Sequence, residues 1–119
     1  MDADLLSRLR VAWAAMEAKK AFHLVAYDVS TRTSIAATFL LCSVNSSRQA
    51  QAVADEVDRA LVAVGSRAMS VEGYTGSGWI LMDYGDFLLH IFLEEPRDFY
   101  SLERLWGDAP EIGTTLRSS

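Results

Sequence analysis

The sequence predicts a single α/β domain in which one mixed, five-stranded sheet is flanked by helices. Apolar residues recur at three- and four-residue intervals in two long segments, which is typical of amphipathic helices. Five short apolar runs alternate with these segments and end at polar or glycine-containing turns. The chain has 119 residues, a length typical of one domain. The resulting element order, αββαβββα, implies a sheet covered by helices.

The first helix is expected to end near Lys19 and Lys20, whose charges suit the negative end of a helix dipole. A strand over residues 22–29, a polar turn and a second strand over 35–42 follow. The second strand is apolar on both faces toward its end, which is typical of a central strand. The apolar face of this first helix consists of Leu5, Leu6, Leu9, Ala12, Trp13 and Met16.

The second helix is expected to begin at a cap, either Asn45 or Ser46, and to stop at Gly65. Three more strands follow, over residues 68–73, 79–83 and 87–92, and the last two form a hairpin across the turn Tyr84-Gly85-Asp86. The positions of this second helix that are expected to face the sheet are Ala50, Val53, Ala54, Val57, Leu61 and Val64.

A last helix is expected over residues 99–106, with Asp98 as its cap. Gly107 and Pro110 end it. The remaining residues have little apolar surface to bury, so we expect a domain over residues 1–109 and a loose C-terminal tail over 110–119.

Composition indicates a cytoplasmic globular protein. The single cysteine, Cys42, lies in an apolar run and has no partner for an intrachain disulfide, which favours a reducing compartment. No apolar run is long enough to span a membrane. Asp2 and Asp4 at the N-terminus are unlike a signal or transit peptide.

The net charge of −5 is unevenly distributed. Residues 1–70 carry eight basic and seven acidic side chains, whereas residues 71–119 carry three basic and nine acidic ones. An acidic C-terminal part repels phosphates, so direct binding to nucleic acid is not expected, and a basic protein partner is favoured.

Two aspartates flank the predicted hairpin turn. A turn aspartate usually accepts a hydrogen bond from a backbone N–H two residues later, and this role suits Asp86. Asp83, at the end of a strand, is placed as a metal-binding carboxylate would be. Gly76 and Ser77 with both aspartates resemble the outline of a nucleotidyl-transfer site. The chain lacks a third well-placed acid and a basic cradle for a triphosphate, so catalysis is not expected.

His90 lies in the middle of the second hairpin strand. Both faces of that strand are largely apolar, so a buried and an exposed histidine are both consistent with the sequence. The only other histidine is His23, and no cysteine or glutamate stands at ligand spacing, so neither a metal site nor a cofactor is expected. Strand alternation places Leu88, His90 and Phe92 on one face and Phe87, Leu89 and Ile91 on the other.

Aromatic residues are interleaved with the C-terminal acids. Tyr100 and Trp106 are expected to pin the last helix to the sheet. Trp79 begins a strand after a glycine-rich loop, and Tyr84 lies at a turn tip, so both are expected to be exposed. Exposed aromatic residues surrounded by charges are good anchors for a protein partner.

These residues resemble the Iojap family, the ribosomal silencing factors. The similarity spans residues 15–109 and consists of V-E-G, W-x-x-x-D-Y-G-D, H-x-F and R-x-F-Y-x-L-E-x-L-W, in that order, with NSSRQ at the head of a helix. The resemblance implies a fold distantly like that of nucleotidyltransferases, without their activity. It implies binding to a ribosomal protein of the uL14 family on the large subunit, where the protein blocks joining of the small subunit and represses translation under nutrient limitation.

The chain departs from the family pattern at a few positions. The family usually has glycine where Val44 stands and an acid where Ala37 and His23 stand. Pro96 is a further departure, before Arg97. The first three positions belong to the first two strands and the connection that follows them, so the hairpin motif is unaffected.

We therefore expect aromatic anchors and acids of the hairpin to contact a basic ribosomal surface. A homodimer is also plausible, because the apolar face of Leu88 and Phe92 needs cover. The alternatives are a metal-dependent nucleotidyltransferase-like enzyme, a large-subunit assembly factor without silencing activity, and a dimeric scaffold. The expected contact residues are Trp79, Met82, Asp83, Tyr84, Asp86, Glu94, Glu95 and Arg97.

Overall fold

The computed structural model of the chain describes residues 2–76, 78–93 and 109–117. The helix expected over residues 99–106 lies outside the described residues. The described elements are α1 (Ala3–Ala18), β1 (Phe22–Asp28), β2 (Thr38–Val44), α2 (Ser47–Ala63), β3 (Ser70–Glu72), β4 (Trp79–Asp83), β5 (Phe87–Leu93) and α4 (Gly113–Leu116).

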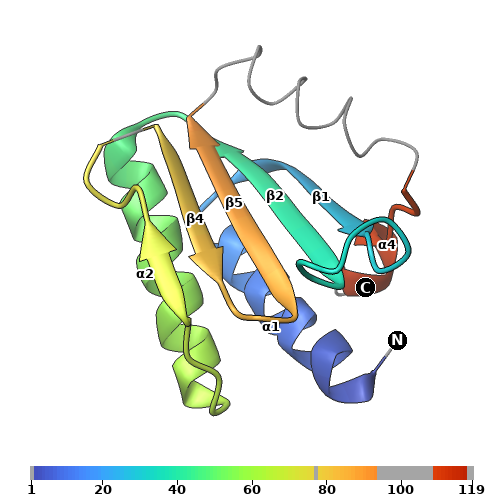
Figure 1. Cartoon of the computed structure of the whole chain (residues 1–119). Coiled ribbons are helices and arrows are strands. Elements are labelled where there is room, and N and C mark those ends of the chain that lie inside the picture. Colours follow the sequence, from blue (N-terminus) through green and yellow to red (C-terminus); the bar gives the residue numbers. More distant parts are fainter. Residues whose placement is uncertain (1, 77, 94–108, 118–119) are drawn as a thin grey trace.

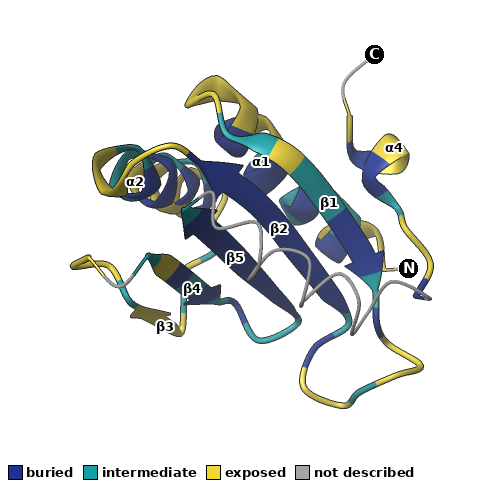
Figure 2. Ribbon diagram, turned by 90° about the horizontal axis from the view of Figure 1, so that it is seen from above, coloured by how far each residue is buried: buried dark blue, intermediate teal, exposed yellow. Residues whose placement is uncertain are grey.

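One mixed sheet forms the centre of the fold, with its strands in the order β1-β2-β5-β4-β3 (Figure 1). β2 and β5 run parallel, and every other neighbouring pair is antiparallel. α1 and α2 pack against each other and cover one face of the sheet (Figure 2). The predicted fold class, one α/β domain with a five-stranded mixed sheet, is confirmed.

The two long helices begin at side-chain caps. A carboxylate oxygen of Asp2 accepts a hydrogen bond from the backbone N–H of Leu5 at 3.3 Å. Of the two caps considered for α2, Ser46 is the one used, and its hydroxyl accepts from the N–H of Gln49 at 3.0 Å. Such caps satisfy backbone donors that have no partner within the helix. Gly65, with a φ of +83°, follows the end of α2 as expected.

Gln49 also joins the two helices. Its side-chain oxygen accepts from the N–H of Asn45 at 2.7 Å. Its side-chain nitrogen donates to the carbonyls of Lys19 and Lys20 at 3.1 and 3.0 Å. The end of α1 is therefore fixed to the start of α2 by one amide, which satisfies carbonyls that helix ends leave open.

β2 lies three residues later than predicted at its start and two residues later at its end. The pairing register sets these bounds, because Thr38 lies opposite both Asp28 of β1 and Phe87 of β5. The preceding loop bulges into solvent, and Ile35, predicted to lie in the strand, is 67% exposed. All seven residues of β2 are buried, as expected of a strand inside the sheet.

Three of the four departures from the family pattern, His23, Ala37 and Val44, lie at different places, and Pro96 lies outside the described residues. His23 has a φ of +51°, which is uncommon for a residue with a side chain, and the register of β1 against β2 shifts between Phe22 and Val25. Val44 is buried at the end of β2. Ala37 donates its backbone N–H to the carbonyl of Asp86 at 2.9 Å, a contact with the hairpin turn that does not depend on the side chain at position 37.

Within the described residues the core consists of two clusters, one on each face of the sheet. Phe87, Leu89 and Ile91 of β5 belong to the cluster beneath α1 and α2. Leu88 and Phe92 belong to the cluster on the opposite face. The alternation predicted for this strand is therefore confirmed, and both of its faces are buried over most of their length.

The expectation of a loose tail is wrong for residues 110–117. The carbonyl of Pro110 accepts from the N–H of Asp28, and the N–H of Ile112 donates to the carbonyl of Ala26, both at 2.8 Å. These residues occupy the outer edge of β1. An unpaired strand edge offers backbone donors and acceptors to any segment that reaches it, which apolar composition alone does not reveal. Leu116 of α4 is buried in the cluster beneath the helices.

Replacing Leu116 with alanine tests whether this segment stabilises the domain. We expect Leu116→Ala to lower the free energy of unfolding by about 2–3 kcal/mol, because a buried leucine leaves a cavity. Thr114→Ala, at an exposed position of the same short helix, is the control and should change it by less than about 0.5 kcal/mol. Urea denaturation followed by circular dichroism measures both. Equal, small effects would show that the segment contributes nothing to stability.

Candidate partner-binding surface on the β4–β5 hairpin

The side chains of β4 point alternately to the two faces of the sheet. We call the face away from α1 and α2 the open face. Ile80 and Met82 point toward the helices and are buried, and Met82 is only 1% exposed. Trp79, Leu81 and Asp83 point the other way. Trp79 is 46% exposed, while Leu81 and Asp83 are partly exposed. Met82 is therefore a core residue in the folded chain and not the surface contact we expected, because the strand period places it inside.

Trp79 rests on a row of aromatic rings that crosses three strands. Its indole stacks on Phe92 at a centroid distance of 5.3 Å and on His90 at 5.9 Å. His90 in turn meets the edge of Phe39 of β2 at 5.4 Å. We call Phe39, His90, Phe92 and Trp79 the aromatic row. Offset and edge-to-face contacts at these distances are the arrangements that aromatic rings favour.

His90 is the buried polar member of this row. Its ring is 6% exposed, and its Nδ1 accepts a hydrogen bond from Nε1 of Trp79 at 3.2 Å. Burial lowers the pKa of His90 to about 4, so the imidazole is neutral at physiological pH. Of the two possibilities left open by the sequence, the buried and hydrogen-bonded histidine is the one observed.

Tyr84 is buried although it lies in the hairpin turn. The residue is 7% exposed, and its ring stacks on Phe87 at a centroid distance of 4.7 Å. Burial and the nearby charge of Asp58 raise the pKa of Tyr84 to about 12. The expectation that this tyrosine is exposed is wrong, because the turn folds back toward α1 and α2 and the tyrosine ring joins the core beneath them.

The turn contact expected of Asp86 is made by Asp83, and Asp86 forms an ion pair that was not expected. Oδ1 of Asp83 accepts from the N–H of Gly85 at 2.8 Å, so Asp83 makes the local turn contact that we assigned to Asp86. Both carboxylate oxygens of Asp86 instead bind the guanidinium of Arg8 in α1. That guanidinium lowers the pKa of Asp86 and raises the pKa of Arg8, whose Nε also pairs with Asp4 at 3.0 Å. No feature of the sequence pairs Arg8 with a residue 78 positions away.

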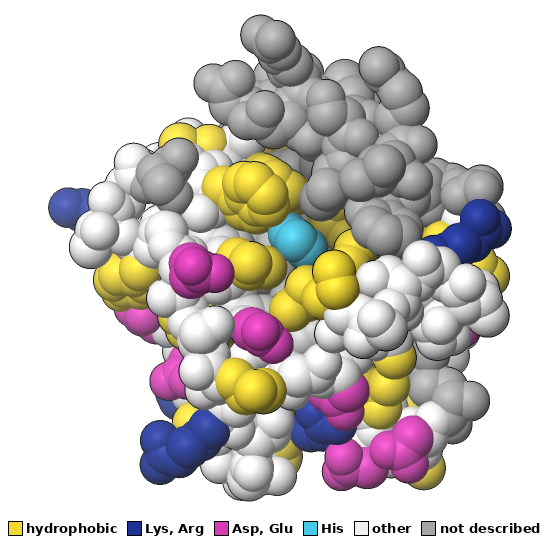
Figure 3. All heavy atoms as spheres, viewed as in Figure 1, with side chains coloured by type: hydrophobic (Ala, Val, Ile, Leu, Met, Phe, Trp, Pro, Cys, Tyr) yellow, Lys and Arg dark blue, Asp and Glu magenta, His cyan; other side chains and the backbone are white. Residues whose placement is uncertain are grey.

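Figure 3 shows the surface that results, with hydrophobic side chains gathered around a histidine and flanked by acidic ones. Of the expected contact residues, the structure places Trp79 and Asp83 on the open face, at opposite ends of β4. It holds Asp86 against α1 and buries Met82 and Tyr84. Glu94, Glu95 and Arg97 lie outside the described residues. Leu81, between Trp79 and Asp83, was missed, although the strand alternation alone would have identified it.

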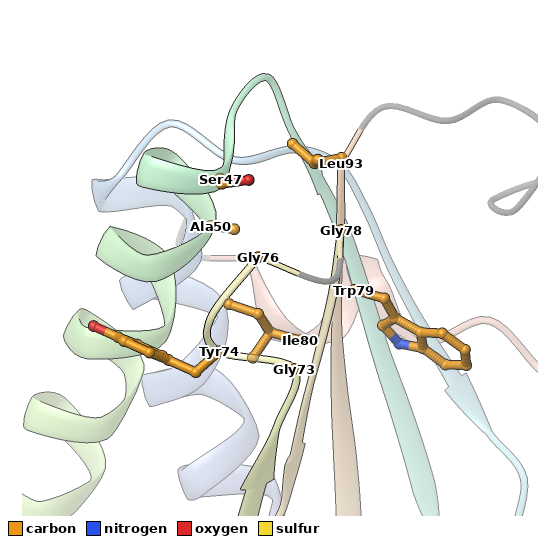
Figure 4. Close-up of a pocket in the computed structure, with 9 residues that line it drawn as sticks. All are labelled: Ser47, Ala50, Gly73, Tyr74, Gly76, Gly78, Trp79, Ile80 and Leu93. Atoms are coloured by element: carbon orange, nitrogen blue, oxygen red, sulfur yellow. The ribbon is translucent and has the colours of Figure 1, made fainter.

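The outline of a nucleotidyl-transfer site does not assemble. Ser77 lies outside the described residues, and Gly76 precedes β4 while Asp83 ends it. The strand alone separates Gly78, just after that pair, from Asp83 by about 17 Å at about 3.3 Å per residue. The cavity at the glycine-rich end is lined by residues without acidic side chains and holds about 10 Å³, room for about one water molecule (Figure 4). Among the described residues no three His, Cys, Asp or Glu side chains gather as metal ligands would.

The described helices include none that is both long and apolar enough to cross a membrane.

Two substitutions of Tyr84 separate the contributions of its ring and its hydroxyl to stability. Among the described residues the hydroxyl has no hydrogen-bond partner, and an unpaired buried hydroxyl is destabilising. We expect Tyr84→Phe to leave the free energy of unfolding unchanged or to raise it, and Tyr84→Ala to lower it by about 3 kcal/mol. Thermal and urea unfolding measure both. A large loss on Tyr84→Phe would show that the hydroxyl has a stabilising partner.

The buried imidazole makes stability depend on pH. The unfolded chain takes up a proton near pH 6.5, whereas folded His90 takes it up only near pH 4. The free energy of unfolding should therefore fall as the pH falls through this window, by at most about 3 kcal/mol. The measurement is urea unfolding at intervals between pH 4 and pH 8. His90→Asn should show a smaller decrease of the free energy of unfolding with falling pH. An identical pH dependence in this variant and the unmodified protein would contradict the lowered pKa of His90.

Comparison with known proteins identifies the family of this chain. The family described as "Ribosomal silencing factor during starvation" matches residues 2–119. Over 104 residues the chain is 39% identical to "Ribosomal silencing factor RsfS" of Halalkalibacterium halodurans, covering 87% of this chain and 89% of that protein. A segment of 36 residues is 47% identical to "Protein Iojap, chloroplastic" of Zea mays, covering 30% of this chain and 16% of that protein.

A solved structure has the same fold. The crystal structure of a protein from Chromobacterium violaceum superposes with a TM-score of 0.79 at 32% identity, covering 92% of this chain and 90% of that one. A match over nearly the full length, together with relatives at this identity, is decisive. The chain belongs to the ribosomal silencing factor family.

Proposed function

We propose that this protein silences translation by binding the large ribosomal subunit. It binds a ribosomal protein of the uL14 family and, by occupying that surface, excludes the small subunit. The step is steric and requires no catalysis, cofactor or metal. The protein acts in the cytoplasm. The observation that carries the proposal is the open-face stripe of β4, in which a half-exposed indole is followed by an apolar and an acidic side chain.

The contact is centred on Trp79, Leu81 and Asp83. A tryptophan on a rigid strand is suited to be the dominant anchor, because it offers a large apolar surface and loses little conformational freedom on binding. The ring is already held by the aromatic row. Asp83 is partly exposed at the other end of the strand, where its carboxylate is proposed to meet a basic side chain of the partner.

The buried members of the expected contact set have a different part in the proposal. Met82 and Tyr84 support the strand and the turn from within the core and do not touch the partner. Asp86 is bound to Arg8, so its charge contributes little to attraction. Glu94, Glu95 and Arg97 follow β5 directly in the sequence and are proposed to extend the contact beyond the described residues.

Electrostatics would mainly affect the rate of association. The acidic excess of residues 71–119 attracts a basic ribosomal surface and repels exposed nucleic acid phosphates. Charges at the rim of an interface act more on encounter and on the exclusion of wrong partners than on affinity. The affinity is therefore assigned to Trp79 and Leu81, and the steering to Asp83 and the acids around it.

The apolar face of Leu88 and Phe92 no longer favours a homodimer. Leu88 and Phe92, expected to need cover by a second copy, are buried within one chain. A dimer through the open face would hide Trp79, so we propose that any such dimer competes with ribosome binding.

Trp79→Ala tests the anchor. We expect it to weaken binding to purified large subunits by at least about thirtyfold, the equivalent of about 2 kcal/mol for a dominant aromatic contact. Asp83→Lys should weaken binding most at low salt, because attraction becomes repulsion. Binding is measured by co-sedimentation on sucrose gradients, and silencing by the rate of subunit joining.

Ile35→Ala is the matched control, since Ile35 is a large exposed apolar residue outside the stripe. It should bind and silence as the unmodified protein does. Undiminished co-sedimentation of a folded Trp79→Ala protein would rule out the proposed contact. Intact binding without any effect on subunit joining would favour the assembly-factor alternative.

A further inference from the structure

We propose that His90 is a positioning residue for ribosome docking, which sets the orientation of the Trp79 indole through the hydrogen bond from Nε1 of Trp79 to its own Nδ1. This inference rests on the proposed function and deepens it. His90 does not itself contact the partner, because its ring is buried in the aromatic row. Its effect on binding is exerted through the indole that it holds.

The geometry leaves the indole one favoured orientation. Trp79 and Phe92 lie opposite each other in the β4–β5 register, and His90 lies two residues before Phe92 on the same face of β5. Stacking alone tolerates sliding and flipping of an indole, because one ring face is much like the other. The bond at 3.2 Å removes this freedom, because only one edge of the indole carries a donor.

The tautomer of His90 follows from this bond. Since Nδ1 accepts the indole proton, a neutral imidazole carries its own proton on Nε2. A protonated imidazole would carry hydrogen on both nitrogens and could not accept from Trp79. Burial keeps the ring neutral well below physiological pH, so the acceptor is available at physiological pH.

An apolar side chain at position 90 would fill the site between Phe39 and Phe92 equally well. It would leave the indole N–H without this acceptor. A half-exposed anchor that samples several orientations loses part of its affinity on binding, because one orientation must then be selected. The histidine therefore stabilises the docking-competent orientation of a surface residue.

The test is a matched pair of substitutions at position 90. Asparagine and leucine have nearly the same shape, but only asparagine places an acceptor near the position of Nδ1. We expect His90→Leu to weaken binding to large subunits by about threefold to tenfold, the range of one neutral hydrogen bond. His90→Asn should stay within about twofold of the unmodified protein.

A spectroscopic readout follows the bond itself. The chain has three tryptophans, so the indole N–H signal of Trp79 in a ¹H–¹⁵N spectrum is identified by its absence in Trp79→Phe. His90→Leu should shift this signal and speed its exchange with solvent, whereas His90→Asn should preserve slow exchange. Circular dichroism checks that both variants are folded.

A substitution on the donor side covers the case in which His90→Leu does not fold. Benzothienylalanine at position 79 keeps the bicyclic shape and has sulfur in place of the N–H. It should weaken binding as His90→Leu does.

The outcomes separate this inference from the function on which it rests. If the bond is lost and binding is unchanged, while Trp79→Ala still abolishes binding, the positioning role is wrong and the docking surface stands. If Trp79→Ala itself binds normally, the docking surface is wrong, and the positioning role falls with it.

Discussion

The parallel pairing of β2 with β5 is the constraint on which the other features depend. It joins segments more than forty residues apart in the chain, and its register runs without interruption from Thr38 opposite Phe87 to Val44 opposite Leu93. Because both strands are buried on both faces, a shift by one residue would exchange every side chain between the two clusters. The register therefore decides that His90 lies on the face of the sheet away from α1 and α2, where its ring is buried. The antiparallel pairing of β4 with β5 then places Trp79 beside it.

Much of the fold was predictable from the sequence, because each long element follows a single period. The helical spacing of α1 and α2, and the alternation in β4 and β5, come from local rules that hold regardless of distant residues. The bounds of β2 were predicted less well. They depend on which residues of β1 and β5 lie opposite, and no local pattern carries that information. The contact of residues 110–112 with β1 was missed for the same reason.

The candidate site was predictable in its location and not in its details. The motif around Trp79 and Asp83 identified the hairpin, and alternation would have separated inward from outward side chains had it been applied to Met82. The exposure of Tyr84 could not be judged from its place in a turn, since the direction in which a turn folds is set by the helices beneath it. Charge was also overestimated, because Arg8 neutralises Asp86 from the far end of the chain.

The closure of the β1 edge bears on how the chain folds as it is synthesised. β1 emerges from the translating ribosome early, whereas residues 110–112, which pair with its outer edge, emerge more than eighty residues later. Until then the nascent chain carries an exposed, partly apolar edge that is open to pairing with neighbouring chains. Contacts of such long sequence separation also form slowly. A silencing factor with this topology covers the outer edge of β1 only after most of its polypeptide has left the ribosome, the particle whose activity it is proposed to repress.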